Sequence, residues 1–175
     1  LTKIFLGFGD PLQTEVLLNI RSPRVLLAAF VGAGLGISGA ALQGLFRNPL
    51  ADPALIGVSA GAAFGAVSAI VLINTGLSFL QLGSFLVPLA AIIGSLVVIG
   101  LIYILTASFT NSGILYMLLV GIALNAISTV GIGFLTFISS DSQLRTLTFW
   151  MMGSFGSTSW ELLLPAVVLI MVTIF

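Results

Sequence analysis

The chain carries few side chains that could do chemistry. It contains no His and no Cys, which excludes zinc sites, iron–sulfur clusters, thiol nucleophiles and histidine general bases. Its single lysine, Lys3, is too close to the N-terminus to end a G-x-x-x-x-G-K-[ST] phosphate-binding loop. We therefore predict no catalytic residue, no metal site and no cofactor, and we expect any ATP hydrolysis to take place on another polypeptide.

One apolar segment carries a polar face. Gly121, Asn125, Thr129 and Gly133 are spaced four residues apart, so they share one side of a helix, and Ser128 lies beside them. An amide inside hydrocarbon needs a hydrogen-bond partner or a wet cavity. Two interpretations stay open: Asn125 bonds to a neighbouring helix, or this helix lines a transport path. No apolar segment has a charged residue in its interior, which argues against a proton-coupled mechanism.

The composition shows what kind of element must hold these residues. Of 175 residues, 59% are hydrophobic and only 6% are charged, whereas soluble domains are about 25% charged. This composition indicates an integral membrane protein. The formal net charge is zero, so electrostatics gives no reason to expect a nucleic-acid partner.

Five apolar segments are expected to be membrane-spanning helices, because barrel strands would alternate apolar and polar residues over only about 10 positions. They cover about residues 25–46, 54–73, 85–107, 113–138 and 159–175, the last one incomplete. We predict an all-α, polytopic helix bundle that forms a single transmembrane domain over residues 1–175. Because the sequence starts at Leu1 and stops inside an apolar run, we expect a fragment that is truncated at both ends.

Caps and glycine spacing support this arrangement. Asp52 and Pro53 suit the N-cap and first position of the second helix. Small residues recur every four positions in the first two segments, which favours close helix crossings in lipid. They are Gly32, Gly36, Ala40 and Gly44, then Gly57, Gly61 and Gly65.

Several strings then make the sequence recognisable. Arg21-Ser-Pro-Arg24 begins the first segment, and Arg47-Asn-Pro-Leu-Ala-Asp-Pro53 joins it to the second. Leu55-Ile-Gly-Val-Ser-Ala-Gly-Ala-Ala63 and Leu147-Thr-Phe-Trp150-Met-Met-Gly153 follow in order. From about Gly9 to Trp160 the chain resembles the permease family of ABC importers for iron–siderophore complexes, haem and cobalamin.

The resemblance implies a permease of ten helices, of which this chain would supply helices two to five and the start of helix six. It implies a homodimer in the bacterial cytoplasmic (inner) membrane, surrounded by membrane lipid. Its further partners would be cytoplasmic ATPase subunits and an external or periplasmic solute-binding protein. The substrate would be an iron complex (siderophore or haem) or cobalamin, with a slight preference for haem or another iron complex.

The resemblance also assigns roles to residues. Arg21 and Arg24 would face the outside, against the positive-inside rule, and dock acidic side chains of the binding protein; headgroup anchoring or pairing with Glu15 is the alternative. Asn125, Ser128 and Thr129 would face the translocation path. The cytoplasmic gate would comprise Thr110, Asn111 and Ser112. The cytoplasmic turn would comprise Arg47, Asn48, Pro49, Asp52 and Pro53, with a structural role or a role in gating or ATPase contact.

Two other classes remain. One is half of a secondary transporter built from inverted repeats, in which broken helices surround a site at the membrane midplane. The other is a structural or assembly membrane protein. The absence of charge inside the spans and the 47–53 string favour the importer permease. Trp150 and Trp160, near span ends, are expected in the aromatic belt.

Overall fold

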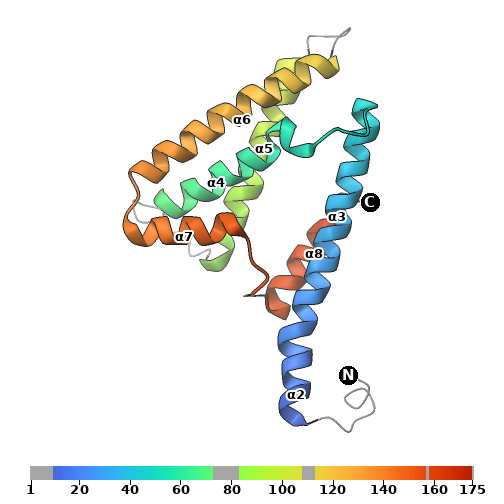
Figure 1. The fold of residues 1–175 in the computed structure, drawn as a ribbon, viewed down its shortest axis with the longest axis vertical. Coiled ribbons are helices and arrows are strands. Elements are labelled where there is room, and N and C mark those ends of the chain that lie inside the picture. The colour runs from blue at the N-terminus through green and yellow to red at the C-terminus, as the bar shows by residue number, and fades with distance from the viewer. Residues whose placement is uncertain (1–9, 73–82, 108–112, 157, 175) are drawn as a thin grey trace. The chain divides into compact units, whose positions relative to one another are not determined.

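The computed structural model describes residues 10–72, 83–107, 113–156 and 158–174, and these residues form helices and connections without a strand. The predicted all-α fold is confirmed (Figure 1). The chain divides into two compact units. We name them the α3–α8 unit, Leu1–Ala41 with Gly153–Phe175, and the α4–α7 unit, Leu42–Met152.

The first helix is longer than the predicted segment 25–46. It comprises α2 (Pro11–Glu15), a π-helical turn η1 (Val16–Arg21) and α3 (Ser22–Phe46). It begins at Pro11 because the Asp10 carboxylate accepts a hydrogen bond from the Leu12 amide at 3.3 Å, and proline suits the first helical position. The cap sets where the helix begins, whereas the apolar run shows only where hydropathy rises.

The remaining helices are α4 (Val58–Leu72), α5 (Leu86–Thr106), α6 (Gly113–Phe137), α7 (Asp141–Met152) and α8 (Trp160–Ile174), with short 3₁₀ turns η2 (Pro53–Ile56) and η5 (Gly83–Phe85). Four of these helices lie within the predicted apolar segments, whereas α7 lies between the fourth and the fifth segment. Among the described residues, three helices are long and apolar enough to cross a membrane, namely Pro11–Phe46, Leu86–Thr106 and Gly113–Phe137. Val58–Leu72 and Trp160–Thr173 are apolar but shorter. The protein is a multi-pass membrane protein, and the exact limits of its spans stay a prediction.

In the α4–α7 unit, α4 and α5 cross with their backbones in close approach. A Cβ added at Gly61 would lie 2.8 Å from the Gly94 carbonyl oxygen, and one added at Gly94 would overlap the Gly61 carbonyl oxygen. A Cβ at Gly65 would overlap the Ala90 carbonyl oxygen. Only glycine fits at such a crossing, so the small residues of α4 are packing residues.

Two apolar clusters complete this unit. The first joins α4 to α6 and α7 and contains Val67, Ile70, Val71, Leu135 and Leu147. The second joins η2 to α5 and contains Ile56, Val98 and Ile102, with Leu42 and Phe46 of α3 packed against it. Together they hold α4 between α5, α6 and α7.

In the α3–α8 unit, α8 runs alongside α3 in the same direction (Figure 1). A Cβ at Gly34 would lie 3.5 Å from Cγ2 of Ile170, an ordinary contact distance. Pro23 and Leu163 are the buried side chains among this unit's described residues. The packing role predicted for Gly32 and Gly36 stays a prediction.

Candidate functional site

The turn after α3 is a Schellman motif. The Asn48 amide donates to the Gln43 carbonyl at 3.1 Å, and the Arg47 amide donates to the Gly44 carbonyl at 3.2 Å. Arg47 therefore occupies the left-handed position, with φ of 49°, that glycine usually takes. A left-handed non-glycine residue costs about 1–2 kcal/mol, so Arg47 adopts this conformation against a local backbone preference.

Two side chains then fix the rest of the turn. Asn48 Oδ1 accepts from the Leu50 amide at 2.9 Å, and Asp52 Oδ1 accepts from the Ala54 amide at 2.8 Å. Asp52 is thus an N-cap as predicted, but it caps η2, and α4 begins only after Gly57, whose φ is 79°. The turn is exposed at its tip, where Leu50 is 85% exposed.

Asn125 lies where this turn meets α6. Its Nδ2 donates to the Ala54 carbonyl at 3.5 Å, a long bond that reaches the second residue of η2. Gly57 packs nearby, since an added Cβ would lie 2.8 Å from the Gly121 carbonyl oxygen and 3.3 Å from the Asn125 amide nitrogen. Asn125 is therefore half-buried and contacts the segment that follows the turn.

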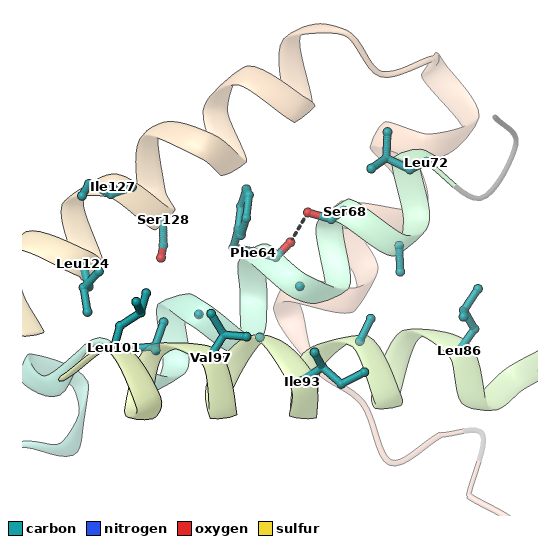
Figure 2. A pocket seen from close by; sticks show the side chains of 16 residues that line it. Phe64, Ser68, Leu72, Leu86, Ile93, Val97, Leu101, Leu124, Ile127 and Ser128 are labelled. Atoms are coloured by element: carbon teal, nitrogen blue, oxygen red, sulfur yellow. Dashed lines mark hydrogen bonds between the residues drawn. The ribbon is translucent and has the colours of Figure 1, made fainter. Parts of the chain in front are cut away.

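Ser128 lies in a different environment. It is 7% exposed, and its side chain points from α6 into an apolar groove of about 440 Å³ between α4, α5 and α6 (Figure 2). The other hydroxyl in the groove, that of Ser68, donates to the Phe64 carbonyl at 2.7 Å. Ser128 makes no hydrogen bond within the described residues, so its hydroxyl remains available in this groove.

Thr129 and residues 110–112 are the remaining residues that were predicted to border the path or to form the gate. Thr129 is exposed, and its hydroxyl donates to the Asn125 carbonyl at 2.8 Å within α6. Asn125, Ser128 and Thr129 therefore share one helix but face three different surroundings. Thr110, Asn111 and Ser112 lie outside the described residues.

The two arginines before α3 also differ. Arg24 is half-buried, and its Nη2 donates to the Gly156 carbonyl oxygen at 2.6 Å. Arg21 is exposed and has no polar contact within the described residues. The Glu15 carboxylate accepts from Nδ2 of the Asn19 side chain at 2.7 Å, and the described part of the chain contains no ion pair between Glu15 and either arginine.

The two tryptophans make contacts that the sequence reasoning missed. The Trp160 indole donates from Nε1 to the Leu18 carbonyl at 3.2 Å. Trp150 packs against the apolar cluster of α4, α6 and α7. Both side chains thus have specific partners inside their own units.

Ser140 and Gln143 were also missed, although their S-x-x-Q spacing is a capping-box signal. The Ser140 amide donates to Gln143 Oε1 at 2.9 Å, and the Gln143 amide donates to Ser140 Oγ at 3.4 Å. Gln143 Nε2 also donates to the Val71 carbonyl at 3.0 Å. The Gln143 side chain therefore caps the start of α7 and also satisfies a carbonyl at the C-terminal end of α4.

Comparison with known proteins gives consistent results. The profile of the FecCD transport family matches residues 1–175. The hemin transport system permease protein HmuU of Yersinia pestis is 46% identical over 159 residues, which cover 91% of this chain and 47% of that protein. The molybdate import system permease protein MolB of Haemophilus influenzae is 38% identical, and the match covers 89% of this chain and 44% of that protein.

Two further relatives extend the range. The cobalamin import system permease protein BtuC of Halobacterium salinarum is 39% identical, with 93% of this chain and 43% of that protein covered. A solved metal-chelate-type ABC transporter in an inward-facing conformation gives a TM-score of 0.76 at 36% identity, covering 89% of this chain and 47% of that chain. This chain spans slightly under half the length of these relatives. The family resemblance drawn from the sequence motifs is confirmed: the chain belongs to the FecCD transport family.

Proposed function

We propose that this chain is the N-terminal half of the permease subunit of an ATP-driven importer. The family match along its whole length carries this proposal. The missing phosphate-binding loop fits it, because the energy then comes from separate ATPase subunits. The remaining partners would be a solute-binding protein and a second permease copy, and the location would be the bacterial cytoplasmic membrane.

For the substrate, we propose a bulky metal chelate, with haem as the first candidate and an iron–siderophore complex or cobalamin as the others. The support is the 46% identity to a hemin permease, set beside 39% to a cobalamin permease and 38% to a molybdate permease. The chain has no His or Cys, so it would hold a haem iron without ligating it through those residues.

Within this function, we assign roles to the site residues. Ser128 and its α6 neighbours Asn125 and Thr129 border the translocation path, and residues 110–112 belong to the cytoplasmic gate. The exposed turn Arg47–Asp52 faces the cytoplasm, where the left-handed Arg47 serves gating or ATPase contact. Arg21 and Arg24 lie at the outer rim, where the binding protein docks.

The test is reconstituted transport. The full-length permease is placed in liposomes with its ATPase subunit, and uptake of haem, a ferric siderophore and cobalamin is measured with the matching binding protein outside. We expect ATP-dependent uptake of one chelate and none with an ATPase subunit that lacks its phosphate-binding lysine. ATP-independent uptake, or ATP turnover by the permease alone, would refute the proposal.

A further inference from the structure

A second groove, of about 360 Å³, lies between α6 and α7 in the α4–α7 unit. It shares no lining residue with the groove that holds Ser128. Its volume falls in the range of small-molecule sites, about 300–1,000 Å³. The side chains that matter for its chemistry are Thr136 of α6 and, on α7, Leu144, Leu147, Thr148, Met151 and Met152.

The sequence of α7 explains why it presents this wall. Its five lining residues follow the spacing i, i+3, i+4, i+7 and i+8, so they share one face of the helix. Leu147 is buried in the apolar cluster that joins α4, α6 and α7, which fixes this face against the rest of the unit. Met151 and Met152 follow at the C-terminal end of α7 and are 57% and 76% exposed, so both thioethers are accessible.

The hydroxyl groups of this groove already have partners within their own helices. Thr136 donates to the Ile132 carbonyl at 2.7 Å, and Thr148 donates to the Leu144 carbonyl at 2.8 Å. The other side-chain heteroatoms of the groove are the sulfur atoms of Met151 and Met152. A thioether is a soft ligand, and methionine is one of the residues that bind haem iron in proteins. The absence of His and Cys therefore does not exclude a haem ligand from this chain.

We propose that the groove between α6 and α7 binds one face of a haem and that the Met152 thioether ligates its iron. Met152 is the more exposed of the two methionines, so its sulfur reaches a ligand more readily, whereas Met151 contacts the macrocycle as a polarizable apolar side chain. This inference rests on the proposed importer function and selects haem among its candidate substrates.

The chemistry of the ligand supports this choice. Haem iron has axial positions that a side chain can fill, whereas the iron of a ferric siderophore is already enclosed by the oxygen atoms of its chelator. A soft thioether binds ferric iron weakly, which suits a transport site because its substrate must also leave.

The experiment measures the binding of hemin and of metal-free protoporphyrin IX to the full-length permease in nanodiscs, with empty nanodiscs as the blank for partition into lipid. Protoporphyrin keeps the macrocycle but lacks the iron, so it reports on the groove without ligation. The variants are Met152→Leu, Met151→Leu and, as a matched control on α8, Met171→Leu. Leucine conserves volume and removes the sulfur. The sulfur-to-iron charge-transfer band in the absorption spectrum of bound hemin reports on the ligand itself.

We expect Met152→Leu to lower the affinity for hemin by about tenfold, to abolish the charge-transfer band and to leave the affinity for protoporphyrin unchanged. Met151→Leu should lower both affinities by one common and smaller factor and keep the band, because this side chain contacts only the macrocycle. Met171→Leu should change neither affinity.

Each contrary outcome has its own meaning. Unchanged hemin affinity in both groove variants would overturn the site. An equal loss of hemin and protoporphyrin affinity in Met152→Leu, or a band that only Met151→Leu abolishes, would overturn ligation by Met152. These results are separate from the importer function, which the uptake assay tests: ATP-dependent uptake of a siderophore or cobalamin without uptake of haem would refute this inference and leave the importer standing.

Discussion

The crossing of α4 and α5 allows a sharp test of how this membrane bundle is held together. Gly94 and Gly100 both lie in α5, but a Cβ at Gly94 would overlap the Gly61 carbonyl oxygen and lie 3.2 Å from Cα of Gly65. A Cβ at Gly100 would meet no atom within 4 Å in the described part of the chain. The same substitution, glycine to alanine, therefore meets backbone at one site and open space at the other.

The expected difference follows from two terms. Alanine stabilises a helix by about 1 kcal/mol relative to glycine, and this gain applies to both positions. At Gly94 the added methyl faces backbone atoms, which cannot rotate away, so α4 and α5 must separate at an overpacking cost of about 1–3 kcal/mol. The helix term cancels in the comparison, and Gly94→Ala should be less stable than Gly100→Ala by about 1–3 kcal/mol.

The free energy of unfolding of the full-length permease is measured by denaturant titration in mixed micelles. The titration is done for the wild type and for both variants. Gly133→Ala on α6, where an added Cβ is also unobstructed, serves as a second control. Equal stabilities for Gly94→Ala and Gly100→Ala would mean that the crossing is not tightly packed, and the structural reasoning would be refuted.

Two further predictions concern single side chains. Gln143→Glu keeps the acceptor for the Ser140 amide but directs a carboxylate at the Val71 carbonyl, so unfolding free energy should fall by about 1–3 kcal/mol. Ser140→Ala, which leaves the bond from Gln143 to the Val71 carbonyl, should lower the unfolding free energy by about 0.5–2 kcal/mol. A Gln143→Glu variant as stable as the wild type would contradict the double role of Gln143 in capping α7 and bonding to α4. Arg47→Gly should raise stability by about 1 kcal/mol through relief of the positive φ, yet impair transport in the reconstituted importer. Unchanged transport in that variant would show that the arginine has no functional contact.

The sequence predicted the features that depend on local physics. Apolar runs predicted helices in the segments that hold α3, α4, α5, α6 and α8, because hydrocarbon requires backbone bonds to close within each segment, whereas they did not predict α7. The Asp52 side chain was recognised as a cap because its partner is two residues away. The glycines of α4 were recognised as packing residues because close crossings in lipid need small residues at that spacing.

The sequence did not predict features that need two distant segments. The Leu18 carbonyl and the Trp160 indole are 142 residues apart, and the bond between them follows from the π-helical turn. Arg47 was assigned to the turn after the first segment, but its left-handed position, where glycine is usual, was not predicted. The S-x-x-Q signal of Ser140 and Gln143 was present, but its link to α4 depends on how α7 folds back.

Four side chains among the described residues make long-range hydrogen bonds that share one property. Their donors are Arg24, Asn125, Gln143 and Trp160, and every acceptor is a backbone carbonyl in a loop, a 3₁₀ turn, a π-helical turn or the last turn of a helix. A chain with 6% charged residues uses these polar groups where regular helix hydrogen bonding stops, because unpaired carbonyls are costly in a membrane. Exposed Arg21 and groove-lining Ser128 make no such bond within the described residues. Arg21 and Arg24, alike in sequence, therefore differ in the structure, because Arg24 bonds to a backbone carbonyl and Arg21 makes no polar contact within the described residues.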